Sequence, residues 1–350
     1  MQPVPEPASL PALLDRLRRR GHPVRSVALM AGDVSRRVYH RVAFDGGATA
    51  VLALHPPGLR DACRRSLETG ALLAGAGVRV AEVLDEDCDA GWLLLEDLGE
   101  RTLYEHADRP WRELAGWFED AIAAIGRIAA LPRDEVAALN PPLDRDLLAR
   151  ELRQTREAFL EPLGLMGGLI GGHDLVESPA GSSLEAALDA LCARLGAETP
   201  VPCHRDFGAR NLMPLGEPGS PRVGVLDHQD LRLGPPAYDL ASLLNDSLFP
   251  PPEDEERLLR LGLGSEGADG REAYHRAAAQ RTLKAVGSYA AFARRGEGRH
   301  VGLVPPTLRR AVGHLARVPE TAPLAPRLEE LWQPALEGRG LDGLLPPPTP

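Results

Sequence analysis

The sequence predicts an α+β fold in which a small antiparallel sheet with one helix precedes a larger, mainly helical part. Between residues 24 and 98, short apolar runs alternate with turn residues, as in antiparallel strands. After residue 98, apolar residues recur every three or four positions over long stretches, as in helices packed on a core. We therefore expect an N-terminal lobe over residues 1–98 and a C-terminal lobe over residues 99–350.

The first lobe should contain five strands, separated by turns and by a single helix. Asp45-Gly46-Gly47 is a typical hairpin turn between the second and third strands. The helix is expected from Asp61 to Gly75, because Leu67, Ala71 and Ala74 then share one face. The expected strands cover residues 26–30, 37–44, 50–54, 78–84 and 91–95.

The second lobe carries helix signals at several places. Pro110 favours a helix start, and Leu114 and Phe118 follow at helical spacing. A capping box at residues 182–185 predicts the start of another helix. A further amphipathic helix is expected over residues 271–294.

The bulk composition narrows the function classes. The net charge is −10 and the isoelectric point about 5.5, so nucleic acid and anionic membranes are not expected as partners. No signal-peptide run and no membrane-length apolar stretch occurs, so we expect a cytoplasmic protein. The expected oligomeric state is a monomer or weak dimer. We predict neither a disulfide nor a structural metal, because the cysteines are scattered and form no Cys-x-x-Cys pair. They are Cys63, Cys88, Cys192 and Cys203.

One loop and the strand that follows it carry the clearest chemical signal. The loop has His204, Asp206 and Asn211 in the order H-x-D-x-x-x-x-N, and the apolar strand 223–226 leads to Asp227. Phosphoryl transfer from Mg·ATP needs such a set: one carboxylate accepts the proton of the acceptor hydroxyl, while an amide and a second carboxylate hold the metal. The alternative is a surface turn followed by a strand-end cap. The combined order and spacing favour phosphoryl transfer.

These motifs resemble those of the aminoglycoside phosphotransferase and choline kinase superfamily, and most closely its bacterial N-acetylmuramate/N-acetylglucosamine anomeric sugar kinases. The resemblance extends over about residues 25–320. It implies a bilobal, protein-kinase-like fold with a nucleotide-binding N-lobe and a catalytic, substrate-binding C-lobe. The matching segments are residues 32–39, 93–99, 204–207, 210–213, 226–230, 234–235, 238–244 and 280–287.

The resemblance also implies roles for individual residues. Asp206 would be the catalytic base, and Asn211 and Asp227 would bind Mg²⁺. The backbone from Glu96 to Leu98 would form the hinge that meets the adenine of ATP. The substrate-binding candidates are Arg210, Gln229 and Asp230, and the structural candidates are His204 and Asp239. The competing interpretations are a solvated turn at Glu96, surface positions for Gln229 and Asp230, and helix capping by Asp239.

The expected nucleotide lobe lacks the usual phosphate-binding signals. It has no G-x-G-x-x-G motif and no lysine, since Lys284 is the only lysine of the chain. We expect a phosphate-binding turn in which Ser35, Arg36 and Arg37 supply a hydroxyl and guanidinium groups instead. Glu68 is the candidate to position such an arginine. The alternatives are a solvated hairpin, an exposed Glu68, and loss of catalysis altogether.

The resemblance, together with these motifs, implies a kinase that uses ATP and Mg²⁺ to phosphorylate a small-molecule amino sugar at its anomeric hydroxyl, for cell-wall sugar salvage. An anomeric hydroxyl is comparatively acidic, so Asp206 with an unshifted pKa should suffice as its base. The alternatives are a kinase for another hydroxyl, such as that of an aminoglycoside, and a non-catalytic ATP-binding pseudokinase. The basic segment 294–300 would repel a polycationic aminoglycoside if it lines the acceptor side.

Overall fold

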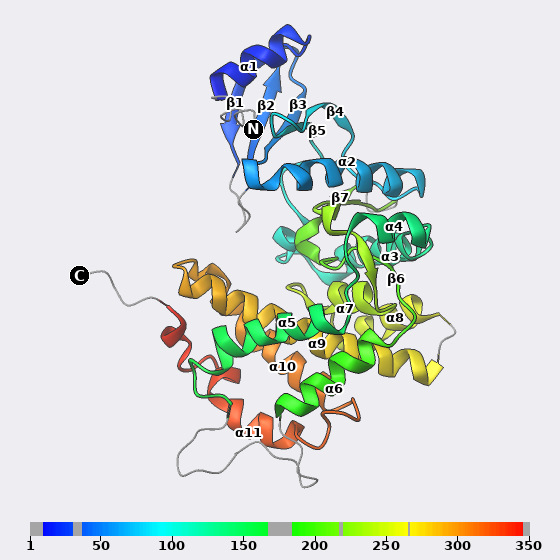
Figure 1. Cartoon of the computed structure of the whole chain (residues 1–350), viewed down its shortest axis with the longest axis vertical. Coiled ribbons are helices and arrows are strands. Elements are labelled where there is room, and N and C mark those ends of the chain that lie inside the picture. The colour runs from blue at the N-terminus through cyan, green and yellow to red at the C-terminus, as the bar shows by residue number, and fades with distance from the viewer. Residues whose placement is uncertain (1–9, 31–36, 167–183, 217–219, 265–266, 346–350) are drawn as a thin grey trace, which may run out of the picture. The chain divides into compact units, whose positions relative to one another are not determined.

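The computed structural model describes residues 10–30, 37–166, 184–216, 220–264 and 267–345, and Figure 1 labels its elements. The chain forms two compact units. The first unit contains residues 1–101, 213–215 and 223–230, and the second contains residues 102–212, 216–222 and 231–350. The segment that ends in Asp227 therefore groups with the N-terminal residues, although the chain reaches it from the second unit.

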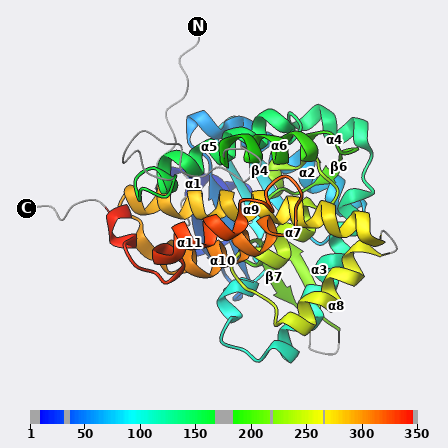
Figure 2. The ribbon, with the colours of Figure 1, turned by 90° about the horizontal axis from the view of Figure 1, so that it is seen from below.

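The second unit is built around the 28-residue helix α9 (Gly267–Arg294). Helices α5 (Arg145–Thr155), α7 (Tyr238–Asn245) and α10 (Val304–Leu315) pack directly against it (Figure 2). Gly287 permits the close approach of α5, since a Cβ atom there would lie 2.6 Å from the Cα of Thr155.

The other elements confirm a mainly helical second part. They are α3 (Trp111–Ala129), α4 (Arg133–Leu139), α6 (Leu184–Gly196), α8 (Pro252–Leu263), α11 (Ala325–Leu336) and the antiparallel strands β6 (Val201–Cys203) and β9 (Arg232–Gly234). The serines of the predicted capping box, Ser182 and Ser183, lie outside the described residues. Among the helices described, none is both long and apolar enough to cross a membrane.

The first unit contains a five-stranded antiparallel sheet in the order β1-β2-β3-β5-β4, which confirms the predicted fold class. Its strands are β1 (Val24–Leu29), β2 (Val38–Phe44), β3 (Thr49–Leu54), β4 (Val83–Asp87) and β5 (Trp92–Glu96). The fourth strand begins later than predicted because the segment before it has another partner: the carbonyl of Arg79 accepts a hydrogen bond from Val225 N–H (2.7 Å). Val225 ends β8 (Arg222–Val225), which pairs with β7 (Leu212–Leu215).

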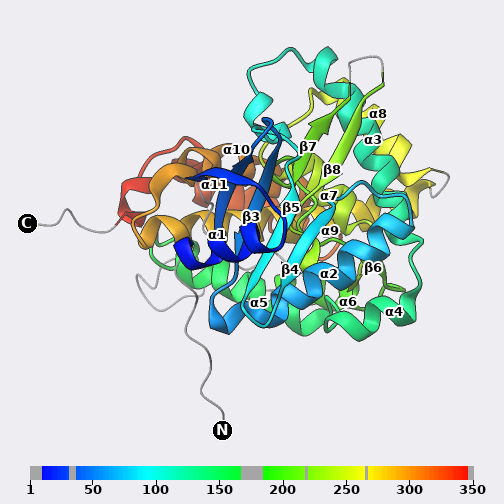
Figure 3. The same cartoon turned by 90° about the horizontal axis from the view of Figure 1, so that it is seen from above.

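Two helices cover the sheet, where the sequence pattern predicts one. The unpredicted helix α1 (Leu10–Arg19) buries Leu13 and Leu17 on one face of the sheet (Figure 3). The predicted helix is α2 (Arg60–Gly75), which packs on the opposite face. Strand β5 serves both faces by alternation, because Trp92 and Leu94 point to the α1 side while Leu93 and Leu95 point to the α2 side.

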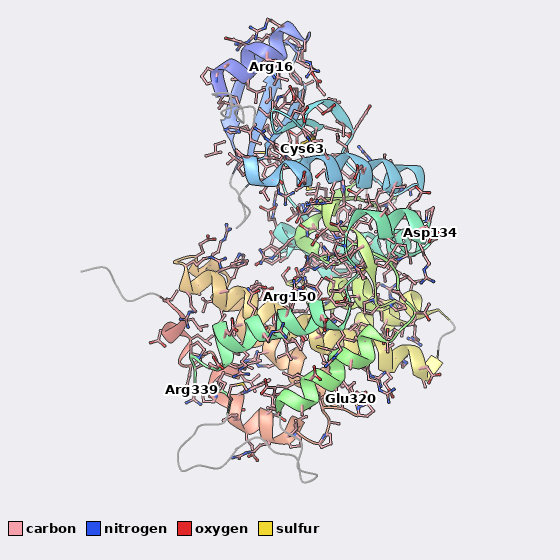
Figure 4. All side chains as sticks on the ribbon, viewed as in Figure 1. Arg16, Cys63, Asp134, Arg150, Glu320 and Arg339 are labelled. Atoms are coloured by element: carbon pink, nitrogen blue, oxygen red, sulfur yellow. A yellow bond between two sulfur atoms is a disulfide. The ribbon has the colours of Figure 1, made fainter. Side chains whose placement is uncertain are left out.

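The prediction of no disulfide is wrong. Cys63 of α2, labelled in Figure 4, is disulfide-bonded to Cys88 in the turn between β4 and β5, with the two Cα atoms 5.6 Å apart. They are 25 residues apart in sequence, and only the packing of α2 against the sheet brings them together. Cys192 and Cys203 are free and buried.

Candidate active site

The loop that carries Asp206 begins where β6 ends and is fixed by α7. The Asp239 carboxylate accepts hydrogen bonds from the backbone N–H groups of His204 (2.6 Å) and Arg205 (2.9 Å). Asp239 is buried, and burial raises the pKa of its carboxyl group. Arg205 has a left-handed backbone conformation (φ 77°), which is uncommon for a residue other than glycine. Asp239 thus sets the backbone path directly before Asp206.

The Asp206 carboxylate lies beside two cations of α9. Its Oδ1 atom accepts a hydrogen bond from Lys284 Nζ (2.7 Å) and lies 3.2 Å from Nη2 of Arg281. Burial raises the pKa of Asp206, but Lys284, Arg281 and Arg205 outweigh burial and hold the pKa well below its ordinary value. This corrects the expectation of an unshifted pKa. The carboxylate is ionised throughout the neutral range and is a weak base.

A second carboxylate, Glu151 of α5, connects these cations to the loop. It accepts hydrogen bonds from Arg205 Nη2 (2.6 Å) and Gln280 Nε2 (3.0 Å), and one of its oxygens lies 3.7 Å from Lys284 Nζ. Burial raises the pKa of Glu151, but the charges of Lys284 and Arg205 have the larger effect, so the pKa is lowered overall. The side chain is only 8% exposed, so it serves as an internal counter-ion.

Sequence reasoning missed Glu151, Arg281 and Lys284 as parts of this site. The available signal was the charge pattern of α9, where Arg281 and Lys284 lie within a stretch of buried alanine, leucine and threonine. Charged residues are rarely buried unless they are paired, so their position on this face indicates partners. Nothing in the local sequence identifies those partners.

Arg210 and Asn211, later in the same loop, make contacts of different kinds. The Asn211 side-chain amide donates a hydrogen bond to the backbone carbonyl of Asp206 (2.8 Å). Its amide nitrogen therefore holds the loop, and its side-chain oxygen is an atom that could bind a metal. The Arg210 guanidinium stacks on the ring of Tyr104, 3.9 Å from the ring centroid, which orients it as a cation–π pair.

In the first unit, Asp227 follows β8 and also has a left-handed backbone (φ 60°). Its Oδ1 atom accepts hydrogen bonds from Arg37 and from Gln229 Nε2 (3.0 Å). Arg37 also donates to Gln229 Oε1 (3.0 Å). The structure thus brings together Arg37, Asp227 and Gln229, while Asp230 lies in the same short helical turn, 228–230. Ser35 and Arg36 lie outside the described residues.

Helix α2 contacts the turn at residues 228–230 through Thr69, whereas the prediction for this helix concerned Glu68. Glu68 is exposed, while Arg37 donates hydrogen bonds to Asp227 and Gln229. Thr69 instead lies 2.8 Å from Nδ1 of His228. Since the Thr69 hydroxyl donates to the carbonyl of Arg65 (2.7 Å), it accepts from His228, which assigns the proton to Nδ1. The role of Glu68 in positioning an arginine of the phosphate turn therefore stays a prediction.

The predicted hinge residues are held by side-chain contacts within the first unit. Glu96 pairs with Arg79 and accepts a hydrogen bond from the backbone N–H of Glu82 (3.1 Å). The hydrogen bond from Arg79 lowers the pKa of Glu96. Leu98 packs so closely on Gly224 that a Cβ atom there would lie 2.8 Å from Cδ1 of Leu98. The backbone from Glu96 to Leu98 is therefore fixed.

The three residues of the phosphotransfer motif are divided between the two units. Asp206 and Asn211 belong to the second unit, and Asp227 belongs to the first. Within the described residues, no group of three or more His, Cys, Asp or Glu side chains forms a metal cluster.

The sheet-and-helix fold and the H-x-D-x-x-x-x-N loop define a protein-kinase-like phosphotransferase that acts on a hydroxyl group. Residues 26–279 match the family described as "Phosphotransferase enzyme family", and the chain belongs to this family. A relative named N-acetylmuramate/N-acetylglucosamine kinase, from Pseudomonas aeruginosa, is 33% identical over 323 residues, which cover 87% of this chain and 88% of the relative.

Solved structures show the same fold. The GDP complex of an aminoglycoside 2'-phosphotransferase-IIIa aligns with a TM-score of 0.61 at 13% identity and covers 88% of this chain and 98% of its own. The choline kinase LicA from Streptococcus pneumoniae aligns with a TM-score of 0.55 at 17% identity and covers 87% and 97%, respectively. At these identities the likeness concerns the fold and not the substrate.

Proposed function

We propose that this chain transfers the γ-phosphoryl group of ATP to the anomeric hydroxyl of an N-acetylmuramate- or N-acetylglucosamine-type sugar. The product would be a sugar 1-phosphate for cell-wall sugar salvage. The observation that carries the proposal is the ionised Asp206 carboxylate, anchored beside Lys284 and Arg281. The name of the Pseudomonas aeruginosa relative supports the choice of sugar. Residues 1–98 would bind the nucleotide, and residues 99–350 would bind the acceptor.

In the proposed step, the anomeric oxygen forms a bond to the γ-phosphorus while the bond from that phosphorus to the bridging oxygen breaks. ADP leaves with the electron pair, and the hydroxyl proton passes to Asp206. Because its pKa is depressed, Asp206 orients the hydroxyl and accepts the proton late. The transition state is loose and the anomeric hydroxyl is comparatively acidic, so a weak base such as Asp206 is sufficient.

Asn211 and Asp227 are the residues that would hold Mg²⁺. They fit this ion, because a carboxylate and an amide oxygen are hard oxygen ligands and the Asp227 side chain is 36% exposed. When bound, Mg²⁺ would neutralise charge on the phosphates. The proposed phosphate turn would add Ser35, Arg36 and Arg37, and Arg37 already lies against Asp227. The backbone from Glu96 to Leu98 would meet the adenine.

An aminoglycoside acceptor is the weaker candidate. Aminoglycosides are polycations and bind best where carboxylates are in excess. Around Asp206, the cations Arg205, Arg281 and Lys284 already neutralise the carboxylates of Asp206, Glu151 and Asp246. A neutral or carboxylate-bearing sugar needs no such excess of negative charge. Arg210, stacked on Tyr104, would bind the sugar. Gln229 and Asp230 remain candidates to form hydrogen bonds with its hydroxyl groups.

The test is ATP consumption with a panel of free sugars, their methyl glycosides and aminoglycosides. The methyl glycosides are blocked at the anomeric oxygen, so they should not be phosphorylated while the free N-acetylated sugars are. Equal turnover of methyl glycosides and free sugars would show that another hydroxyl is attacked. Turnover of aminoglycosides but not of the sugars would show that the acceptor is an aminoglycoside.

A further inference from the structure

Lys284, the only lysine of the chain, extends from α9 into the neighbourhood of Asp206. Its side chain is 13% exposed, whereas lysines usually keep their ammonium group in water. The cost of removing this charge from water is offset by Asp206 at 2.7 Å and by Glu151 at 3.7 Å. The carboxylates of Asp206 and Glu151 therefore hold the ammonium group of Lys284 in place.

The contacts of Asp206 distinguish its two oxygens. Lys284 and Arg281 both approach Oδ1, and no hydrogen bond from another described residue reaches Oδ2. The side chain is 34% exposed. Oδ2 is therefore the oxygen that can accept a hydrogen bond from an acceptor hydroxyl, while Oδ1 fixes the rotation of the carboxylate.

The two cations are not equivalent. The buried Arg281 is also held by Ser242 (2.9 Å to Oγ) and lies 3.4 Å from Asp246. Its contact with Asp206 is the longer one, at 3.2 Å. Lys284 makes the short hydrogen bond, so the orientation of Asp206 depends mainly on Lys284.

We propose that Lys284 is a positioning residue of the phosphoryl transfer: it holds Oδ1 of Asp206 so that Oδ2 meets the acceptor hydroxyl. This rests on the proposed function, in which Asp206 is the base. It predicts that Lys284 affects turnover and not nucleotide binding, because Lys284 acts through Asp206. Orientation of reacting groups supplies a large share of the rate, so losing it is costly even when both reactants remain bound.

The experiment compares Lys284→Met, Lys284→Arg and Asp206→Asn by steady-state kinetics and by the thermal shift that Mg·ATP produces. We expect Lys284→Met to lower kcat about 100-fold, with the KM for ATP changed by less than about twofold. Lys284→Arg keeps a donor for Oδ1, so its kcat should lie between those of Lys284→Met and the wild type. The Mg·ATP thermal shift should be unchanged in both variants.

Arg276→Met is the matched control. Arg276 lies on the same helix, its side chain is 14% exposed, and it pairs with Glu272 and with Glu320, which Figure 4 labels. Its loss should lower stability and leave kcat within about twofold of the wild type. A similar loss of kcat in Arg276→Met and Lys284→Met would reduce Lys284 to a structural residue and overturn the proposal.

The remaining outcomes separate this inference from the proposed function. Near-normal kcat in Lys284→Met with an inactive Asp206→Asn overturns only the role of Lys284. An active Asp206→Asn overturns the assignment of the base itself. A rise in the KM for ATP that matches the loss of kcat would make Lys284 a nucleotide ligand instead. Should Lys284→Met fail to fold by circular dichroism, Lys284→Gln replaces it with the same expectations.

Discussion

At the residue scale, Arg37 supplies a positive charge where the sheet of this chain has no lysine. Its side chain is 13% exposed, donates hydrogen bonds to Asp227 and Gln229, and lies 5.8 Å from the ring centroid of Tyr39. Burial lowers the pKa of Arg37, but the carboxylate of Asp227 outweighs burial and the pKa is raised. A guanidinium fixed beside the proposed metal ligand is well placed to meet phosphate oxygens.

Replacing Arg37 by Gln should therefore raise the KM for ATP about tenfold, because charged hydrogen bonds contribute about 1.5–3 kcal/mol. The KM for the sugar should not change. Steady-state kinetics with each substrate varied in turn would measure both constants. Arg16→Gln is the control: Arg16 forms an ion pair with Asp87 in the same unit and is 44% exposed, so its loss should change neither KM. A change confined to the KM of the sugar would contradict the assignment of Arg37 to the nucleotide.

At the element scale, the contact between α5 and α9 positions two of the charged residues. Helix α5 carries Glu151 and α9 carries Lys284, and these side chains approach each other only because the helix axes come close. Gly287 permits this approach, since it has no Cβ atom to meet Thr155. The hydroxyl of Thr155 in turn donates to the carbonyl of Leu283 (2.9 Å), which joins the helices at the same level.

Gly287→Ala should separate these helices. We expect the free energy of unfolding to fall by about 1–3 kcal/mol, as in other overpacked cores, and kcat to fall because Glu151 and Lys284 move apart. Urea denaturation measures the first effect and steady-state kinetics the second. In the control Gly126→Ala, the new Cβ atom on α3 meets nothing within 4 Å. That variant should be about 0.5–1 kcal/mol more stable, because alanine favours helix more than glycine does. A Gly287→Ala protein as stable as the wild type would show that the contact is not tight.

At the scale of the whole molecule, the net charge of −10 does not extend to the surroundings of Asp206. There Arg205, Arg281 and Lys284 balance the carboxylates of Asp206, Glu151 and Asp246. An acidic protein therefore presents no surplus negative charge beside this carboxylate. The disulfide acts at the same scale, because it closes a long loop of the first unit and so restricts the unfolded chain.

Removing this disulfide should lower the free energy of unfolding by about 3 kcal/mol, the cost expected for opening a loop of this length. Thermal unfolding with and without dithiothreitol measures the effect. The double variant Cys63→Ala, Cys88→Ala should be insensitive to dithiothreitol, because Cys192 and Cys203 are free. Alkylation in denaturant without reductant should modify those two cysteines alone, and modification of all four would exclude the disulfide.

The sequence by itself determined the alternation that makes the five-stranded sheet, the helical spacing of the second part, and the order of His204, Asp206, Asn211 and Asp227. These features are local, because side-chain period and motif spacing arise from neighbouring residues. Only the tertiary structure paired Cys63 with Cys88, placed α1 on the sheet and brought Lys284 to Asp206, 78 residues earlier in the chain. Such pairings depend on which helix faces meet, and helix faces meet through packing of residues far apart in sequence, which no local pattern specifies. For the same reason the pKa of Asp206 could not be inferred from its loop: the charges that lower it lie largely on α9.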